Sequence, residues 1–545
     1  MSFNNISKNY FFITIILIFF ILTYNSTVFI ALPYYFGNKF YYLLLSGLIN
    51  FLLIFSFLIS NYFFNIFLSV FILMGFGFKF TLSLIFNSKH MFYDFLNPLS
   101  SGVGNLRMLS QHLLQKSSCQ KNSLELKFEG SNSFVSECSY PLKIIYDGDV
   151  YDKGLVVSII ALSVLLFSII FFDWLTQKKI IKASDYTLKI SDLYEKYRLL
   201  IIFALGISII LVGIVNFQLN IYQRGMKSSF DFFLLKPIVT WLLLFGFLSF
   251  VCHLLFSEYI RKTKGFLFLL PLSFLEPFIS YTSMISRGFI FNAMSLFFGT
   301  LKLVKKTSIF YSMLLLFMIF SLFFLSVYLT QNNRSTLFLN NSFKITAQEK
   351  VQEGQINSKK IKIINKIEKL NINNFLNIDF NINHYDFIPQ VLIERWIGLE
   401  EVIMVANHEK IGWPFLKNSF LEKQADNKLS LFDKEIYKGY LSIDRKTYNF
   451  TSIPGIIAFL YFSNSYIFLS ISIFIISIFC LSIEFISRNI SYGNMFFSSL
   501  IGQILAFRLI HFGVYAIETY KIILTIFLTL IISLIKSKLF FKKVK

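Results

Sequence analysis

The chain has little charge for its length. Of its 545 residues only 15% are Asp, Glu, Lys or Arg, whereas soluble domains carry roughly 25%. A folded soluble chain of this size needs more charged side chains to hydrate its surface, and a disordered chain has far fewer apolar residues. The shortage excludes a soluble enzyme, a disordered chain and a nucleic-acid-binding domain, although the net charge is +21.

The chain also lacks the motifs of soluble chemistry. It has no P-loop, no CxxC pair, no HExxH and no aspartate pair of the kind that holds a metal and a nucleotide-sugar. We therefore expect neither a metal nor another cofactor. Only four cysteines occur. Cys119 and Cys138 fall in a polar stretch, where they either close a small disulfide loop or remain free thiols. Cys252 and Cys480 fall in apolar runs.

Long apolar runs dominate what is present. Hydrophobic residues make up 55% of the chain, with 70 phenylalanines. A membrane-crossing helix needs about 20 mostly apolar residues, because the hydrocarbon core is ~30 Å thick and each residue rises 1.5 Å. The sequence therefore predicts an all-α polytopic membrane protein with about 12 transmembrane helices. The predicted spans are 11–32, 41–60, 61–86, 155–174, 199–219, 236–256, 265–282, 288–303, 307–330, 464–487, 494–511 and 518–536.

Lys and Arg gather in alternate short loops, which predicts cytoplasmic N- and C-termini. The loop at 175–198 is rich in basic residues, and the tail carries Lys536, Lys538, Lys542, Lys543 and Lys545. Two larger segments then fall on the opposite, periplasmic side. The chain divides into helices 1–3 (1–86), a periplasmic segment (87–154), helices 4–9 (155–330), a large periplasmic loop (331–463), and helices 10–12 with the basic tail (464–545).

The large loop contains two readable patterns. Pro389 to Asn407 has helical periodicity, with Leu392, Ile393, Trp396, Leu399 and Ile403 forming an apolar stripe. Around 359–371 a short helix is also expected. Further on, the run that begins at Ile453-Pro454-Gly455 is apolar but too short to cross, and Asn464 and Ser465 interrupt it. We interpret this run as a re-entrant or interfacial piece.

Ionisable groups near helix ends are the candidate site residues, because charge at membrane depth is unfavourable unless it serves a function. The topology places six of them on the periplasmic side: Arg224, Arg287, Arg395, Arg508, His408 and His511. Arginines that converge suit a phosphate-rich anion, since the guanidinium meets phosphate oxygens bidentately. Each Arg could instead reach toward lipid head groups. Glu276 and His253 lie within predicted helices, and a buried, satisfied histidine is the simpler interpretation of His253.

Three stretches carry a resemblance to a known group. They are Arg395-Trp396-Ile397-Gly398-Leu399-Glu400 through His408, then Ile453-Pro454-Gly455-Ile456-Ile457, then Arg508 with His511-Phe512-Gly513. Together with the large outer loop ahead of the last helices, they resemble bacterial polysaccharide polymerases of the O-antigen polymerase (Wzy-type) and O-antigen ligase group. The likeness covers roughly residues 200–540 and does not extend to the segment at 87–154.

The resemblance implies an inner-membrane glycosyltransferase. Such an enzyme joins oligosaccharide repeat units carried on undecaprenyl pyrophosphate into a surface polysaccharide such as lipopolysaccharide. Arg224, Arg287, Arg508 and Arg395 would bind the pyrophosphate, and His408, His511 or Glu400 would be the general base. The implied partners are the lipid-linked oligosaccharide, the bilayer and other polysaccharide-assembly proteins, with no nucleic acid and no metal.

Other functions remain open. A transporter or flippase of lipid-linked glycans would have Glu276, His253 and the arginines along one central passage, although its loops are usually short. A non-enzymatic envelope-assembly protein would leave Arg508 facing lipid or held in a salt bridge. A dolichyl-type glycosyltransferase usually carries an acidic residue in its first outer loop, and the loop at 33–40 has none.

Overall fold

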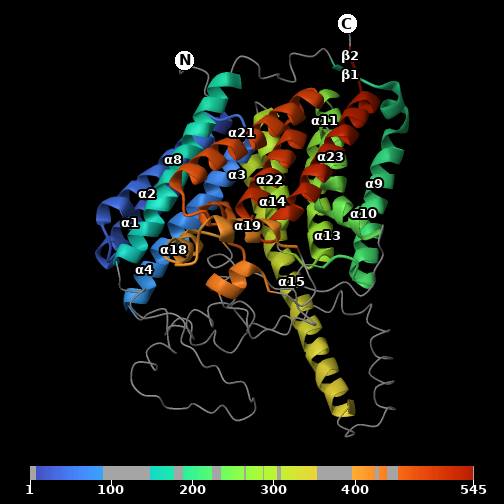
Figure 1. Ribbon diagram of the computed structural model, residues 1–545. Coiled ribbons are helices and arrows are strands. Elements are labelled where there is room, and N and C mark those ends of the chain that lie inside the picture. Colours follow the sequence, from blue (N-terminus) through green and yellow to red (C-terminus); the bar gives the residue numbers. More distant parts are fainter. Residues whose placement is uncertain are drawn as a thin grey trace.

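The protein is described by a computed structural model, which covers residues 8–89, 148–176, 188–223, 235–262, 265–286, 288–303, 309–352, 396–423, 429–437 and 452–543. The structure is about 85% helical, and the helices lie side by side in one bundle (Figure 1). This arrangement confirms the predicted class, an all-α multi-pass membrane protein.

The helices and strands follow one another in three groups. The first is α1 (Lys8–Ala31), η2 (Leu32–Tyr34), α2 (Lys39–Leu58), α3 (Phe63–Ile72), the π-helix η3 (Leu73–Lys79), α4 (Phe80–Lys89) and α8 (Gly148–Thr176). The second is β1 (Leu188–Ile190), α9 (Asp192–Leu219), α10 (Leu235–Trp241), the π-helix η6 (Leu242–Gly246), α11 (Phe247–Ile260), α12 (Gly265–Ser273), α13 (Leu275–Ser283), α14 (Phe289–Leu303) and α15 (Ile309–Gln352). The third is α18 (Leu399–Ala406), α19 (Trp413–Leu421), the π-helix η9 (Asp433–Tyr437), α20 (Gly455–Tyr461), α21 (Tyr466–Ile490), α22 (Met495–Ile510), η10 (Ala516–Glu518), α23 (Thr519–Phe540) and β2 (Phe541–Lys543).

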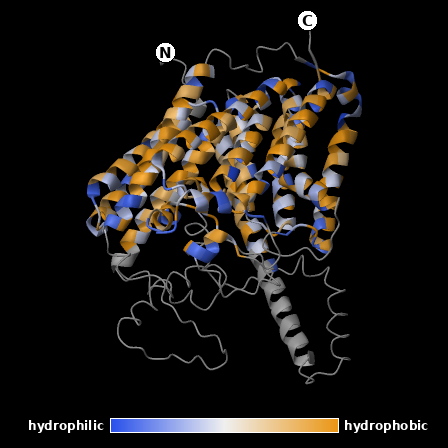
Figure 2. Cartoon of the chain, viewed as in Figure 1, coloured by the Kyte–Doolittle hydropathy of each residue, from blue (hydrophilic) through white to orange (hydrophobic). Residues whose placement is uncertain are grey.

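Ten helices of the described chain are long and apolar enough to cross a membrane, and α14 and α22 are shorter apolar helices. Figure 2 shows that hydrophobic residues predominate along these helices. Each predicted span coincides with a helix or with consecutive helices, and the spans predicted at 288–303 and 494–511 are the two short ones. The count of twelve crossings and the cytoplasmic placement of the termini stay predictions.

Polar side chains begin several of the apolar helices by accepting their first backbone N–H groups. Asn38 accepts from Phe40, and Asn494 accepts from the amides of Phe496 and Phe497. Ser465 does the same for α21 and Ser191 for α9. Three of these capped helices begin within two residues of the predicted starts at 41, 464 and 494, whereas α9 begins seven residues before the predicted 199. Hydropathy sets the middle of a span, and the cap sets where the helix begins.

The short helix α22 is the centre of the bundle. It packs against α3, α14, α21 and α11, and nearly all its residues are buried. Its 16 residues extend only about 24 Å, which is less than the ~30 Å of the hydrocarbon core. One end of α22 therefore stops inside the protein, and α20 lies against that end.

The segment beginning at Ile453 forms the seven-residue helix α20, every residue of which is buried. It ends at Tyr461, and Asn464 then adopts a left-handed conformation with φ 55° before α21 begins. The Gly455 amide, at φ 76°, donates to the Phe512 carbonyl at 3.1 Å. The prediction of a short apolar piece interrupted before the next span is confirmed, and its re-entrant character stays an interpretation.

Three expectations need correction. The two-stranded antiparallel pair β1–β2 is a small exception to the all-α class, and it joins the chain after α8 to the end of α23. The helix expected to end at 330 continues as α15 to Gln352. Lys536, counted in the basic tail, is buried and its Nζ donates to Ser249 Oγ at 2.8 Å, because α23 continues beyond the predicted end at 536.

Figure 1 shows the β1–β2 pair at one end of the bundle and α18 and α19 toward the other. We call these ends the strand side and the α18 side. Lys189, Lys542 and Lys543 lie in the β1–β2 pair itself, and Arg198, Arg261, Lys262 and Lys538 lie in or just after the turns of α9, α11 and α23 that adjoin this pair.

Candidate functional site

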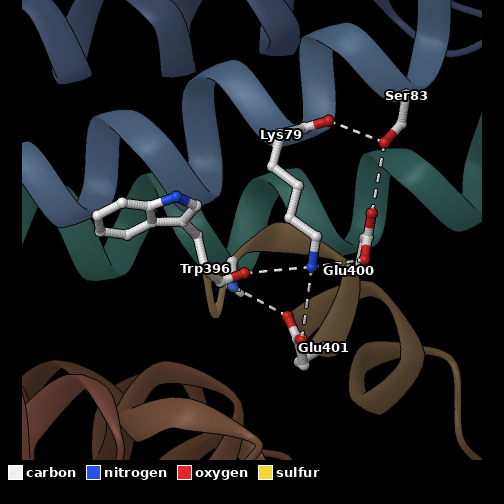
Figure 3. Close-up of polar contacts among 6 residues, drawn as sticks. Lys79, Ser83, Trp396, Glu400 and Glu401 are labelled. Carbon is white, nitrogen blue, oxygen red and sulfur yellow. Dashed lines mark hydrogen bonds and ion pairs between the residues drawn. The ribbon is translucent and has the colours of Figure 1, made fainter. Parts of the chain in front are cut away.

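Lys79, Glu400 and Glu401 form an ionic cluster on the α18 side (Figure 3). The Lys79 ammonium lies 2.9 Å from a Glu400 carboxylate oxygen and 3.9 Å from one of Glu401. It also donates to the Trp396 carbonyl at 3.2 Å. Only 10% of the Lys79 side chain is exposed, against 32% for Glu400. The cluster thus has a buried cation beneath a carboxylate that faces outward.

The lysine is presented by a π-helical turn in a membrane-spanning helix. The segment η3, between α3 and α4, has the wider i→i+5 winding that is often found at functional sites. Lys79 is its last residue, and the following turn carries Ser83, which donates to the Lys79 carbonyl at 2.8 Å. Ser83 Oγ also lies 3.4 Å from Glu400.

The helix α18 supplies both carboxylates from its first turn. It begins at Leu399, so the helix predicted from Pro389 is wrong at Trp396–Gly398, which are not helical; residues 389–395 lie outside the described part of the chain. Gly398 precedes the first turn with φ −154° and ψ −144°. Its amide donates to Glu401 at 2.9 Å. An acidic residue at this position stabilises a helix start, and the bend turns the Trp396 carbonyl toward Lys79.

The cluster holds two carboxylates and one ammonium. Burial raises the pKa of Glu401 above its ordinary value of 4.5, and the neighbouring carboxylate of Glu400 raises it further, while Lys79 lowers it. The formal charge of the three groups is −1 when both carboxyl groups are ionised. Burial thus favours the neutral form of Glu401.

Aromatic rings connect this cluster to His511. The Trp396 ring packs edge-on against Phe71, with centroids 4.4 Å apart, and the His511 ring packs against the same Phe71 at 5.5 Å. The other face of His511 stacks on Phe507 at 4.1 Å. Through Phe71 and Trp396, His511 is thus linked to the segment that carries Glu400. Phe71 and Lys79, the residues that these two predicted catalytic residues contact, are eight residues apart, about 12 Å along the helix.

The hydrogen bonds of His511 define its tautomer. Its Nδ1 lies 3.0 Å from the Phe507 carbonyl oxygen, and a carbonyl oxygen only accepts, so Nδ1 carries the proton. In the neutral ring Nε2 is then the basic nitrogen.

His408, the third predicted catalytic residue, has hydrogen-bond partners on both of its ring nitrogens. Its Nδ1 accepts from the Lys410 amide at 3.2 Å, and its Nε2 donates to the Glu435 carbonyl at 3.1 Å. Lys410 also pairs with the Glu435 carboxylate at 2.9 Å. Both ring nitrogens hold the turn after α18 against the segment 429–437, which is a structural use of the ring.

Arg508 lies in the last turn of α22, half-buried, three residues before His511. It is the one predicted pyrophosphate-binding residue that the described part of the chain includes. Arg224, Arg287 and Arg395 lie outside the described residues, as do Cys119, Cys138 and the helix expected at 359–371.

Behind the cluster lies an apolar cavity of about 50 Å³. Phe76, Ile397 and Val402 form the wall nearest the cluster, and residues of α8, α20, α21 and the end of α22 form the rest. Ser477, whose hydroxyl has no partner, is the polar exception. This cavity is far smaller than the roughly 300–1,000 Å³ of ligand pockets, so the charged cluster, not the cavity, is the candidate site.

Lys79 is the residue that our sequence reasoning missed. It stands alone among apolar residues in Gly75-Phe76-Gly77-Phe78-Lys79-Phe80, and a lone cation inside a span is a signal in its own right. Lys79 lies inside the span predicted at 61–86, away from its ends, and the mean hydropathy of that span stays high in spite of the single charge.

His253 in α11 and Glu276 in α13, the two ionisable residues noted within predicted helices, are not part of this cluster. His253 is fully buried, with Nδ1 2.7 Å from the Ser249 carbonyl oxygen and Nε2 2.9 Å from Ser533 Oγ, which confirms its interpretation as a satisfied histidine. Glu276 accepts from Ser280 at 2.8 Å, and its second oxygen is buried without a partner.

No protein-family model, curated protein or solved structure matches this chain. The family resemblance drawn from the sequence therefore stays a prediction.

Proposed function

We propose that the protein polymerises lipid-linked oligosaccharide repeat units on the α18 side of the membrane, as a glycosyltransferase of the inner membrane. The observation that carries the proposal is the chain of contacts from the Lys79–Glu400–Glu401 cluster to His511: Trp396, whose carbonyl accepts from Lys79, packs on Phe71, and His511 packs on the same Phe71. An inverting glycosyl transfer needs a general base, and this region offers an imidazole and a carboxylate for that role.

The proposed reaction is an inverting displacement. An acceptor hydroxyl oxygen attacks the anomeric carbon of the donor and loses its proton to Nε2 of His511 or to the Glu400 carboxylate. The bond from the anomeric carbon to the pyrophosphate oxygen breaks, and its electron pair leaves with the undecaprenyl pyrophosphate. Arg508, near His511 in the chain, is suited to balance the charge that develops on this leaving group.

The orientation supports the proposal. As part of this proposal we place the strand side in the cytoplasm, because the basic loop at 175–198 and the basic tail lead to the β1–β2 pair. The α18 side then faces outward, where surface polysaccharides are assembled. Both ring nitrogens of His408 already hydrogen-bond within the fold, which makes it a weak candidate base.

Substitution of His511 tests the proposal. His511→Phe retains a ring against Phe507 and Phe71 but removes the basic nitrogen, so we expect normal protein level and about a 10²–10⁴-fold loss of polymerisation. Glu400→Gln should also reduce the rate. Gly47→Ala, where a Cβ meets nothing within 4 Å, is the matched control. The readout is polysaccharide length on a gel, from a host whose own copy of the gene is deleted. Normal length in His511→Phe would overturn the assignment.

Transport of the same lipid-linked glycan is the second candidate, favoured by the buried Glu276 in α13 and Lys536 in α23. Ionisable groups at membrane depth often mark a pathway. A transporter would show a defect in Glu276→Gln and normal polymer in His511→Phe, whereas a polymerase would show the reverse.

A further inference from the structure

The nine-residue helix α19 has an apolar edge that no part of the described chain covers. Trp413, Phe420 and Leu421 are 57%, 47% and 50% exposed, while Phe415 and Leu416 on the other face are buried. Trp413 and Phe420 are seven residues apart and so lie on the same face of the helix, about 10 Å from each other along its axis. An exposed cluster of large apolar side chains in a segment that does not cross the membrane indicates a contact surface.

Three contacts set the position of α19. The Gly412 amide donates to the Phe462 carbonyl at 2.7 Å, and the Phe415 ring packs edge-on against Phe462 at 5.0 Å. On the exposed side, the Trp413 ring packs edge-on against Phe468 at 4.9 Å. Because Phe468 belongs to the first turn of α21, α19 lies level with the point where this span begins.

The exposed edge of α19 continues the lipid-facing surface of α21. Tyr466 and Ile467, also in the first turn of α21, are 41% and 73% exposed. Further along the same span Ile471 and Ile475 are exposed as well. In a span of a multi-pass membrane protein such residues face lipid, so the neighbouring Trp413 adjoins the same lipid.

We infer that α19 is an interfacial helix whose Trp413–Phe420 edge inserts among the phospholipids of the leaflet on the α18 side. Tryptophan is favoured at the boundary between acyl chains and head groups. Lys417 lies one turn from Trp413 and is exposed, so its ammonium can reach the lipid phosphates while its methylenes stay among apolar groups. Amphipathic helices bind membrane interfaces in this manner.

The anchor has a consequence for the cluster. The turn between α18 and α19 is tied down by His408 and Lys410 on Glu435, and Glu422, just after α19, accepts from the Leu431 amide at 3.0 Å. Insertion of α19 therefore fixes the height of α18, and with it Glu400, relative to the leaflet. The inference does not depend on the proposed function.

Site-specific labelling tests the insertion. A nitrobenzoxadiazole fluorophore is attached to Phe420→Cys, and to Asn418→Cys as the matched control, in the full chain reconstituted into phosphatidylglycerol–phosphatidylethanolamine vesicles. Asn418 is also exposed but lies about 140° around the helix from Trp413. The signal from the protein without an introduced cysteine is subtracted, and monodisperse elution in detergent confirms folding. Leu421→Cys is the second reporter if Phe420→Cys does not fold.

We expect doxyl-labelled phospholipids to quench the fluorophore at position 420 at least twofold more than at 418, and aqueous iodide to show the opposite order. Equal iodide quenching at both positions, without lipid quenching, would overturn the inference. So would protection from both quenchers at 420, because that result would place a protein rather than lipid on the helix.

Discussion

Gly75 and Gly398 meet backbone to backbone, one in the π-helical η3 and the other directly before α18. A Cβ on either residue would overlap the backbone of the other segment, with the Ile397 carbonyl oxygen facing Gly75 and the Gly75 carbonyl oxygen facing Gly398. This contact brings the start of α18 onto a membrane-spanning helix. As a result, the Lys79 side chain reaches the Trp396 carbonyl and both glutamates.

Gly75→Ala should therefore weaken the fold at the cluster. The added methyl group has to displace backbone, and overpacking of this kind destabilises by about 1–3 kcal/mol. Gly47→Ala, at an open position of α2, should be neutral or stabilising by up to about 1 kcal/mol. SDS denaturation in mixed micelles measures both. Equal effects of the two substitutions would show that the glycine contact is not required.

Lys79→Met should destabilise the protein by about 1–3 kcal/mol, because it leaves two partly buried carboxylates without their cation. This loss of stability is smaller than that expected when a fully buried ion pair is broken, because Glu400 is 32% exposed and water screens its charge. The double variant Lys79→Met/Glu400→Gln should recover part of the loss.

Lys521→Met is the matched control for the lysine. Lys521 pairs with Glu518 at 2.8 Å on the surface, and its side chain is 57% exposed. Surface pairs of this kind contribute at most about 1 kcal/mol. A Lys79→Met variant that is no less stable than Lys521→Met would contradict a structural role for the ammonium.

The stability of the protein should depend on the protonation of Glu401. Burial raises its pKa above 4.5 in the folded state, with Glu400 and Lys79 as its charged neighbours. A carboxyl group with a raised folded pKa binds its proton more tightly when folded, so its contribution is full below about pH 4.5 and is lost as pH rises through the folded value.

Glu401→Gln removes this titration while an amide oxygen can still accept from Gly398. Relative to wild type, the variant should therefore gain apparent unfolding temperature between pH 4 and pH 8. Thermal unfolding in detergent, followed by tryptophan fluorescence at several pH values, measures the difference. Parallel profiles of the two proteins would contradict the raised pKa.

Glu484→Ala should lower the free energy of unfolding of the protein by about 1–3 kcal/mol. The Glu484 carboxylate accepts from the amides of Phe63 at 2.7 Å and Phe64 at 2.9 Å and so caps α3 from α21. Alanine leaves both buried donors unsatisfied. Glu484→Gln keeps one acceptor oxygen and should lose less, as measured by the same SDS titration; an equal loss would mean that packing, not capping, is the role of this side chain.

The sequence determined the membrane class and the position of the helices, because burial in lipid requires about 20 apolar residues whatever the neighbours are. It also identified Glu400, His408 and His511 as candidate general bases and Arg508 as a candidate pyrophosphate-binding residue. It did not rank them, since the state of an imidazole depends on its partners, such as the Phe507 carbonyl for His511 and the Glu435 carbonyl for His408.

Only the tertiary structure decided which charged groups meet. Lys79 and the Trp396 carbonyl are 317 positions apart, and no periodicity links them. Their contact follows from two glycines that let backbones approach and from α18 folding back onto η3. Hydropathy is a local property of the chain and can be read from it directly, whereas an ion pair between distant segments depends on packing that the whole bundle sets.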